Sequence, residues 1–141
     1  MHNLPIWLDV FIQPLRDNQI AQVAFVAVLI LIALDVIFGV VTAVAKKEYS
    51  SKKMRKGIAH KCSEFGLLMV ALVIDGLIIG GVDIGFTSPV FIASCVYLII
   101  MELASILEII CRCNPQLANS PLFKLLQEAH AIPAVDDEGE D

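Results

Sequence analysis

The chain has little charge and none of the common catalytic motifs. Asp, Glu, Lys and Arg make up 18% of its 141 residues, whereas a soluble domain usually has about 25%. The sequence contains no P-loop, HExxH, GxSxG or GxGxxG pattern, so nothing indicates nucleotide binding, metalloprotease or hydrolase chemistry. We predict no catalytic residue and no cofactor. The one enzymatic alternative is an intramembrane type built on Asp35 and Asp75.

Cysteines and aromatic residues are also scarce. Cys111 and Cys113, with His130, lack the second close pair that a zinc site requires, so we expect no metal site. Aromatic residues form 7% of the chain, and the most basic stretch, residues 46–61, contains only Tyr49. A nucleic-acid groove needs aromatic side chains on which bases stack. We therefore expect this stretch to contact anionic membrane lipids and no nucleic acid.

Apolar residues, in contrast, dominate the chain. They form 57% of it, the mean hydropathy is +0.77, and three runs, residues 20–45, 65–82 and 90–111, are almost free of charge. Each run is close to the ~20 residues that a helix needs to cross a bilayer. None shows the alternating polarity of a membrane β-barrel strand. The sequence predicts an all-α membrane protein with three transmembrane helices in a domain over residues 20–111.

The basic residues predict the orientation of these spans. Seven of the ten lie in the predicted loop 46–64, which the positive-inside rule places in the cytoplasm. With three spans, the N-terminus is then outside and the C-terminus is cytoplasmic. No basic segment precedes the first run, so we expect that run to be an uncleaved anchor. The seven basic residues are Lys46, Lys47, Lys52, Lys53, Arg55, Lys56 and Lys61.

Both ends of the chain are predicted to add amphipathic segments. Residues 1–19 have the apolar spacing of an interfacial helix, and the alternative is a leader broken at Pro14. In residues 112–141, Pro115 breaks the last span and Ser120 opens a short cytoplasmic amphipathic helix before an acidic tail. The predicted apolar faces are Leu4, Trp7, Leu8, Phe11 and Leu15 at the first end, and Leu122, Leu125, Leu126 and Ala129 at the second.

Each predicted span carries at least one carboxylate. Asp35 shares a helical stripe with Gly39 in the first span, Asp75 lies in the second and Glu102 in the third. A charged residue at the centre of a span costs about 2.5–3.5 kcal/mol on insertion scales, so these acids should be protonated, paired or beside water. The alternative is a protonated acid hydrogen-bonded inside the bundle without a transport role. Because three helices offer little interior, we predict a homo-oligomer.

Further candidate contact residues lie in the second and third spans. Gly76 and Gly80 have the four-residue spacing that lets helices approach closely, either between copies or within one chain. Ser105 and Glu108 lie on the polar side of the third span, and Glu108 is one helical turn from Arg112, with which it can pair at the cytoplasmic interface. That polar side is formed by Ser94, Tyr97, Met101, Ser105 and Glu108, with Glu102 at its border.

Several segments together resemble the toxin-secretion/phage-lysis holin family. The likeness extends over residues 33–128, most of the chain. The segment 102–108, ELASILE, resembles the family motif near the end of its last span, and residues 115–126 resemble its amphipathic C-terminal extension. The first part of the likeness is LDVIFGVVTA at 34–43, followed by Lys46-Lys47, Tyr49-Ser50-Ser51 and Arg55-Lys56-Gly57.

The resemblance implies a small protein of the bacterial cytoplasmic membrane that oligomerises into pores or lesions, releases an endolysin or a toxin, and times host cell lysis. Asp35, Asp75 and Glu102 would then be protonated or paired in lipid and would line water in the assembled lesion. Two other classes stay open. One is an antiholin-like regulator that packs against another membrane protein, and the other is a small ion-conducting channel subunit in which the acids form the conduction path.

Overall fold

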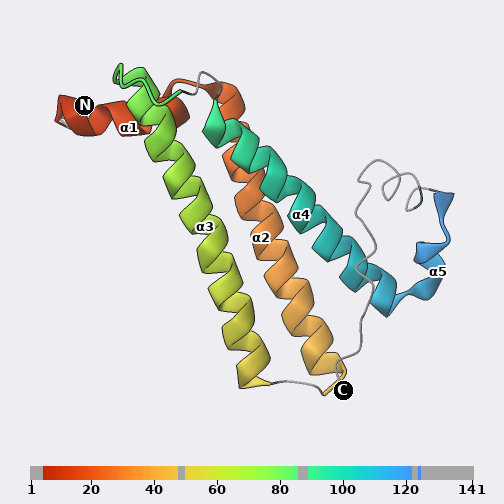
Figure 1. Cartoon of the computed structure of the whole chain (residues 1–141). Coiled ribbons are helices and arrows are strands. Elements are labelled where there is room, and N and C mark those ends of the chain that lie inside the picture. The colour runs from red at the N-terminus through yellow and green to blue at the C-terminus, as the bar shows by residue number, and fades with distance from the viewer. Residues whose placement is uncertain (1–4, 48–49, 86–88, 122–123, 125–141) are drawn as a thin grey trace.

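The computed structural model describes residues 5–47, 50–85, 89–121 and 124, which form five helices and no strand (Figure 1). Three of the helices are long and apolar enough to cross a membrane. The prediction of an all-α protein with three such helices is therefore confirmed. The helices are α1 (Ile6–Arg16), α2 (Gln19–Ala45), α3 (Ser51–Ile79), α4 (Val90–Cys113) and α5 (Pro115–Ala118).

Helix α2 begins at a polar cap and matches the predicted run 20–45 to within one residue. The Asn18 side chain accepts hydrogen bonds from the backbone N–H groups of Ile20 at 3.0 Å and Ala21 at 3.3 Å. These are amides that the start of a helix otherwise leaves unpaired. The helix ends just before Lys47, which adopts a left-handed φ of 54° and so turns the chain toward α3.

Helix α3 begins much earlier than the sequence predicted. We expected a loop over residues 46–64, but the chain is helical from Ser51 onward, so that prediction is wrong for residues 51–64. No proline interrupts this segment, and Lys and Arg have high helix propensity. A run of basic residues therefore lengthens the second span helix at its N-terminal end and does not form a loop.

A pair of glycines ends α3. Gly81 has a φ of 83°, a conformation that side-chain-bearing residues rarely adopt. The N–H of Val82 bonds to the carbonyl of Leu77 at 2.9 Å, and the N–H of Gly81 bonds to that of Ile78 at 3.1 Å. This pattern satisfies the last carbonyls of the helix. At the end of α4, Asn114 stops the helix and caps the short α5.

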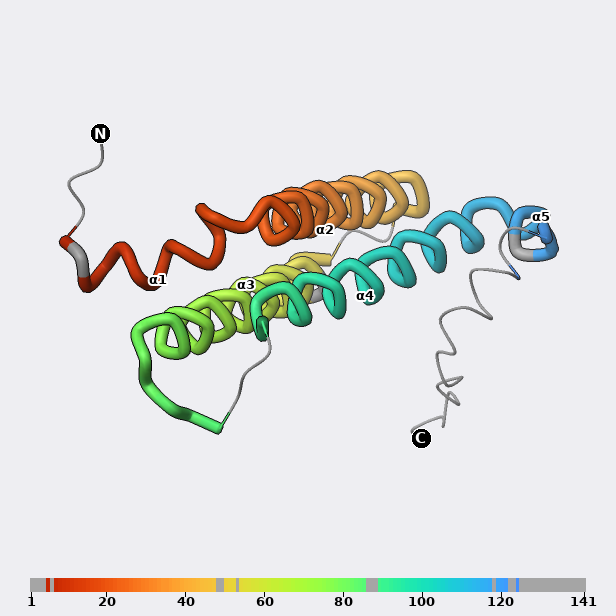
Figure 2. The backbone as a smooth tube through the Cα atoms, turned by 90° about the horizontal axis from the view of Figure 1, so that it is seen from above, coloured from red at the N-terminus to blue at the C-terminus, as the bar shows by residue number. Residues whose placement is uncertain are grey.

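Helix α1 lies across one end of the three long helices, as Figures 1 and 2 show. Pro14 lies inside α1, and the helix continues to Arg16, so the alternative of a leader broken at Pro14 is wrong. A location on the membrane surface stays a prediction for α1. The second predicted amphipathic helix falls mostly outside the described residues, since 122–123 and 125–141 are not among them.

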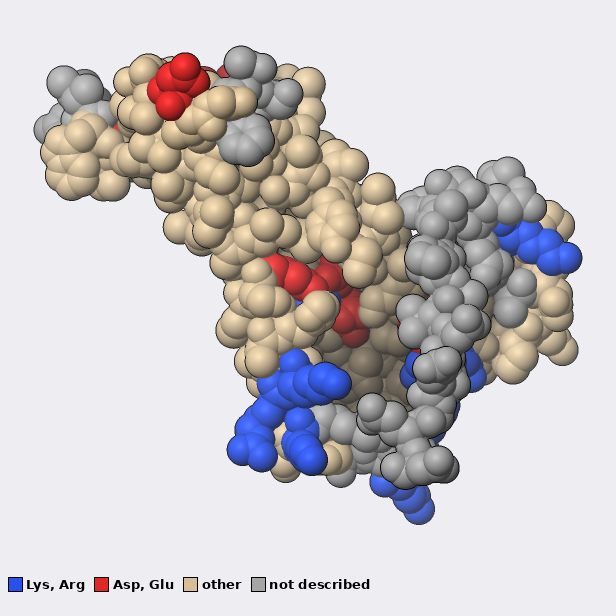
Figure 3. Space-filling view, in the orientation of Figure 1, with Lys and Arg blue, Asp and Glu red and all other residues tan. Residues whose placement is uncertain are grey.

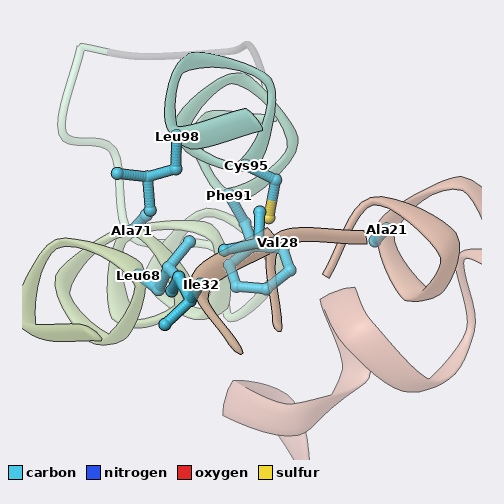
Figure 4. Close-up of a cluster of buried hydrophobic side chains, with 8 residues drawn as sticks. All are labelled: Ala21, Val28, Ile32, Leu68, Ala71, Phe91, Cys95 and Leu98. Carbon is cyan, nitrogen blue, oxygen red and sulfur yellow. The ribbon is translucent and has the colours of Figure 1, made fainter. Parts of the chain in front are cut away.

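The core of the bundle is small and lies between the three long helices. Val28 of α2, Leu68 and Ala71 of α3, and Phe91 and Cys95 of α4 are all buried and converge on one another (Figure 4). Helix α4 packs against both α2 and α3, whereas α2 and α3 make few contacts with each other. The bundle is therefore held together through α4.

Most of the apolar surface of the long helices lies outside this core. Of the most apolar stretch of each helix, only 17% is buried in α2 and 28% in α3 and α4. A soluble protein rarely exposes an apolar surface of this extent, whereas lipid tails solvate it. Together with their length, this composition supports a multi-pass membrane protein.

Candidate functional site

A cluster of charged side chains lies inside the bundle, where all three long helices meet. Lys61 of α3 donates hydrogen bonds to both carboxylate oxygens of Glu102 on α4, at 2.5 and 2.6 Å. The same ammonium lies 3.1 Å from Oδ2 of Asp35 on α2. Glu102 is only 2% exposed. We call Asp35, Lys61, Glu64 and Glu102 the ionic cluster.

Asp35 has a second partner that joins α2 to α4. Its Oδ1 accepts a hydrogen bond from the Ser105 hydroxyl at 2.6 Å. Both carboxylate oxygens of Asp35 are thus occupied, one by a neutral donor and one by the Lys61 ammonium. In the predicted stripe of α2 that contains Asp35 and Gly39, Val28 is buried and the other residues are half-buried.

Glu64 is a member of the cluster that the sequence interpretation missed. Its Oε2 lies 3.5 Å from the Lys61 ammonium and, among the described residues, accepts no hydrogen bond. Its Oε1 lies 3.2 Å from Nε2 of His60, whose imidazole is exposed at the rim. The signal in the sequence is the spacing of His60, Lys61 and Glu64, which share one side of a helix.

The ionic cluster has more negative than positive groups. Three carboxylates surround one ammonium, so full ionisation would leave two uncompensated negative charges. Protonation of the imidazole of His60 would offset one of them. In a low-dielectric interior such an excess is costly unless protons or water compensate it. The cluster therefore needs added protons or water to balance its charge.

The surroundings of Lys61 differ from those that the sequence predicts. We predicted it to be part of a cytoplasmic loop, but its side chain is 15% exposed and points into the bundle. The prediction of a loop at Lys61 is wrong, because α3 starts ten residues before it. The other predicted basic residues with described side chains, Lys46, Lys47, Lys52, Arg55 and Lys56, are exposed. The side chain of Lys53 is not among those described.

Asp75 is buried but lies apart from the ionic cluster. Its carboxylate accepts the backbone N–H groups of Val90 at 2.8 Å and Phe91 at 3.0 Å, which are the first two residues of α4. A carboxylate at a helix N-terminus satisfies free amides and interacts favourably with the helix dipole. Asp75 therefore caps α4 from the neighbouring helix α3.

The two predicted close-packing glycines contact α1 of the same chain. A Cβ on Gly76 would lie 2.5 Å from Cδ1 and 2.9 Å from Cα of Phe11, so only glycine fits there without a shift. A Cβ on Gly80 would lie 3.6 Å from a methyl group of Val10. Within one chain both glycines thus pack near α1, and the alternative of a contact between copies stays a prediction.

Most of the polar side of α4 lies outside the bundle. Tyr97 and Met101 are exposed, and Glu108 pairs with Arg112 at the surface. The face that packs inward is Phe91, Cys95, Leu98, Glu102 and Ile106. Glu102, which the helical pattern placed at the border of the polar side, is thus the buried acid of α4.

The arrangement offers no evident metal site. Within the described part of the chain, no group of three or more His, Cys, Asp or Glu side chains has the geometry to hold a metal ion. At the ionic cluster the Lys61 ammonium occupies the place between the carboxylates. The side chains of the ionic cluster can change their pairing partners and their contact with water.

The bacteriophage holin family matches residues 20–128 of the chain. This range begins at the second residue of α2 and includes α3 to α5 and every member of the ionic cluster, whereas α1 precedes it. No curated protein and no solved structure matches the chain.

Proposed function

The chain belongs to the bacteriophage holin family, and on this premise we propose that it oligomerises in the bacterial cytoplasmic membrane into lesions that time host cell lysis. The cargo is an endolysin or a toxin. The described residues outside the helices form only short connections, which leaves membrane assembly as the main activity these residues can perform.

The ionic cluster is the observation that carries this proposal. Its side chains pair with one another across α2, α3 and α4, which lowers the cost of placing them in lipid. If the helices separate and pair with those of other copies, the same side chains become available to water. The protein then has two states, a packed bundle and a hydrated assembly. The ionic cluster favours the packed bundle until enough copies accumulate.

The orientation is part of the proposal. Basic side chains gather at the end of the molecule where α2 ends and α3 begins, and an acidic group is visible at the opposite end beside α1 (Figure 3). By the positive-inside rule the basic end is cytoplasmic. The N-terminus is then outside the membrane, and the segment after α4 is in the cytoplasm.

The test is induced expression in bacteria, with and without a co-expressed cell-wall hydrolase that lacks an export signal. Culture turbidity and release of a cytosolic enzyme are followed. We expect abrupt lysis that needs both proteins, because only a large lesion passes a folded hydrolase. Membrane-located protein without lysis would support an antiholin-like regulator instead. A fixed small conductance without enzyme release would support a channel subunit.

Variants of the cluster test its part in timing. Lys61→Met removes the ammonium that joins the helices, so we expect earlier lysis. Asp35→Asn removes one of the excess carboxylates but keeps an acceptor for Ser105, so we expect later lysis. Lys52→Gln, an exposed basic residue on the same helix, is the matched control and should leave the timing unchanged. Unchanged timing in both cluster variants, at equal membrane amounts, would contradict this role.

A further inference from the structure

An apolar groove runs between α2 and α3, on a side of the bundle that α4 does not cover. Its volume is about 480 Å³, and Asp35 and Lys61 lie among its lining residues. Apart from these two, the lining is mostly apolar, and Val36, Val40 and Phe65 are exposed along it. Because α2 and α3 make few contacts with each other, the groove is open to whatever surrounds the protein.

Two glycines leave space in the groove. Gly39 of α2 and Gly57 of α3 both line it, and a Cβ added to either would meet nothing within 4 Å. The packing of one chain therefore does not require glycine at these two positions. The space lies where an external group can approach both helix backbones.

The length of the groove matches one leaflet of a bilayer. It extends along α2 from Ile32 to Ala43, which is about 16 Å at the rise of an α-helix. The hydrocarbon core of a bilayer is about 30 Å thick. The groove is therefore about as long as the acyl layer of one leaflet is thick. It begins at the α2–α3 connection.

The end of the groove at this connection is strongly basic. Ala43 and Ser50 both line it, and the exposed side chains of Lys46 and Lys47 lie on the segment that joins them. The exposed basic residues of the first turns of α3 follow directly, and Figure 3 shows Lys and Arg gathered at this end. An apolar groove with a basic end complements an anionic phospholipid. The phosphate would lie at the basic end and one acyl chain would lie in the groove.

We propose that this groove binds an anionic phospholipid of the surrounding bilayer. Copies in one membrane share one orientation, so a second copy placed here would bring its own basic segment to the same depth and be repelled. The site does not depend on lesion formation. It would exist in the single chain even if the proposed function failed.

The test uses the full chain reconstituted in vesicles of equal parts phosphatidylcholine and phosphatidylglycerol. A trace of a photoactivatable analogue of either lipid, reactive in its acyl chain, is added and the labelled peptides are identified by mass spectrometry. We expect the phosphatidylglycerol probe to label the segments around Gly39 and Gly57 more strongly than the phosphatidylcholine probe. Equal labelling of these segments by the two probes would overturn the proposal.

Three variants define the site. Gly39→Leu combined with Gly57→Leu fills the groove and should abolish the preferential labelling. Gly66→Leu is the control, since Gly66 on the same helix is equally open but does not line the groove. Lys46→Gln with Lys47→Asn, in which Asn tolerates the left-handed backbone of position 47, should lower the preference for phosphatidylglycerol at least about fivefold. If neither groove nor lysine variants change the labelling, the proposal is wrong.

Cys62 can report whether a second copy of the chain, and not a lipid, occupies the groove. Cys62 lines it and is exposed. In a variant with Cys111 and Cys113 changed to serine, oxidation in the same vesicles should yield no Cys62–Cys62 disulfide. Efficient disulfide formation between copies would show that a second chain occupies the groove, and it would overturn the lipid site.

Discussion

Lys61 on α3 donates to both carboxylate oxygens of Glu102 on α4, at 2.5 and 2.6 Å, although the two residues are 41 positions apart in the chain. The pair is nearly enclosed, and Asp35 on α2 lies within ion-pair distance of the same ammonium. One basic side chain thus links three helices, two of which, α2 and α3, make few contacts with each other.

The first prediction concerns this pair. Lys61→Met should lower the free energy of unfolding by about 3–5 kcal/mol, because it leaves buried carboxylates without their cation. The double variant Lys61→Met/Glu102→Gln should lose at least about 1 kcal/mol less than the sum of the single variants. Unfolding by dodecyl sulfate in mixed micelles, followed by circular dichroism, measures both. Lys52→Met is the exposed control, and simple additivity of the pair would argue against the contact.

A second prediction concerns the cap of α4. Asp75→Ala removes the acceptor of the Val90 and Phe91 amides, so we expect the protein to lose about 1–2 kcal/mol and these two amides to exchange faster with deuterium. Among the described residues, Asp83→Ala removes an acceptor for the exposed Gly85 amide, and it should have a much smaller effect. Unchanged exchange at the start of α4 would show that Asp75 does not cap it.

The contact between Phe11 and Gly76 gives a third prediction. Gly76→Ala places a Cβ against the ring and backbone of Phe11, so α1 should shift away from α3. Trp7, the single tryptophan of the chain, lies on α1 and reports the shift through its fluorescence. Gly66→Ala meets no neighbour and should leave the emission unchanged. Identical spectra for the two variants would contradict the packing of α1 on α3.

The fourth prediction is that the Glu108–Arg112 pair contributes little. Its side chains are 62% and 64% exposed, and exposed pairs one helical turn apart usually contribute about 0.5 kcal/mol or less. Glu108→Gln should therefore change the dodecyl sulfate midpoint far less than Glu102→Gln. A large loss in Glu108→Gln would indicate that Glu108 is buried in an assembly of several copies.

The fifth prediction concerns pH at the junction of α1 and α2. The side-chain hydrogen bond from Arg16, at 2.8 Å, lowers the pKa of Asp17 below its ordinary value of 3.8. A lowered pKa in the folded state means that the pair stabilises the junction above pH 3.8. This contribution is lost as the pH falls through the lowered pKa. Arg16→Gln should raise the pKa of Asp17 toward 3.8 in a carboxylate NMR titration, and an unchanged pKa would exclude the pairing.

Part of the candidate site could be predicted from the sequence. The intramembrane acids Asp35 and Glu102 were identified because a charged residue is rare and costly in an apolar run. Their partner was not, because Lys61 precedes the second charge-free run and a basic residue there suits a loop equally well. Only the early start of α3 at Ser51 brings Lys61 into the bundle. Glu64 was missed for the same reason.

The sequence by itself determined the number and type of the membrane helices, and the extent of α2 and α4. Lipid offers no hydrogen-bond partners, so each long apolar run must satisfy its own backbone, and a helix is the local solution. The tertiary structure alone decided which acid pairs with Lys61, which acid caps α4, and that Gly76 contacts α1. These relationships depend on the rotation and offset of one helix against another. Packing between distant segments sets both, and no local pattern encodes them.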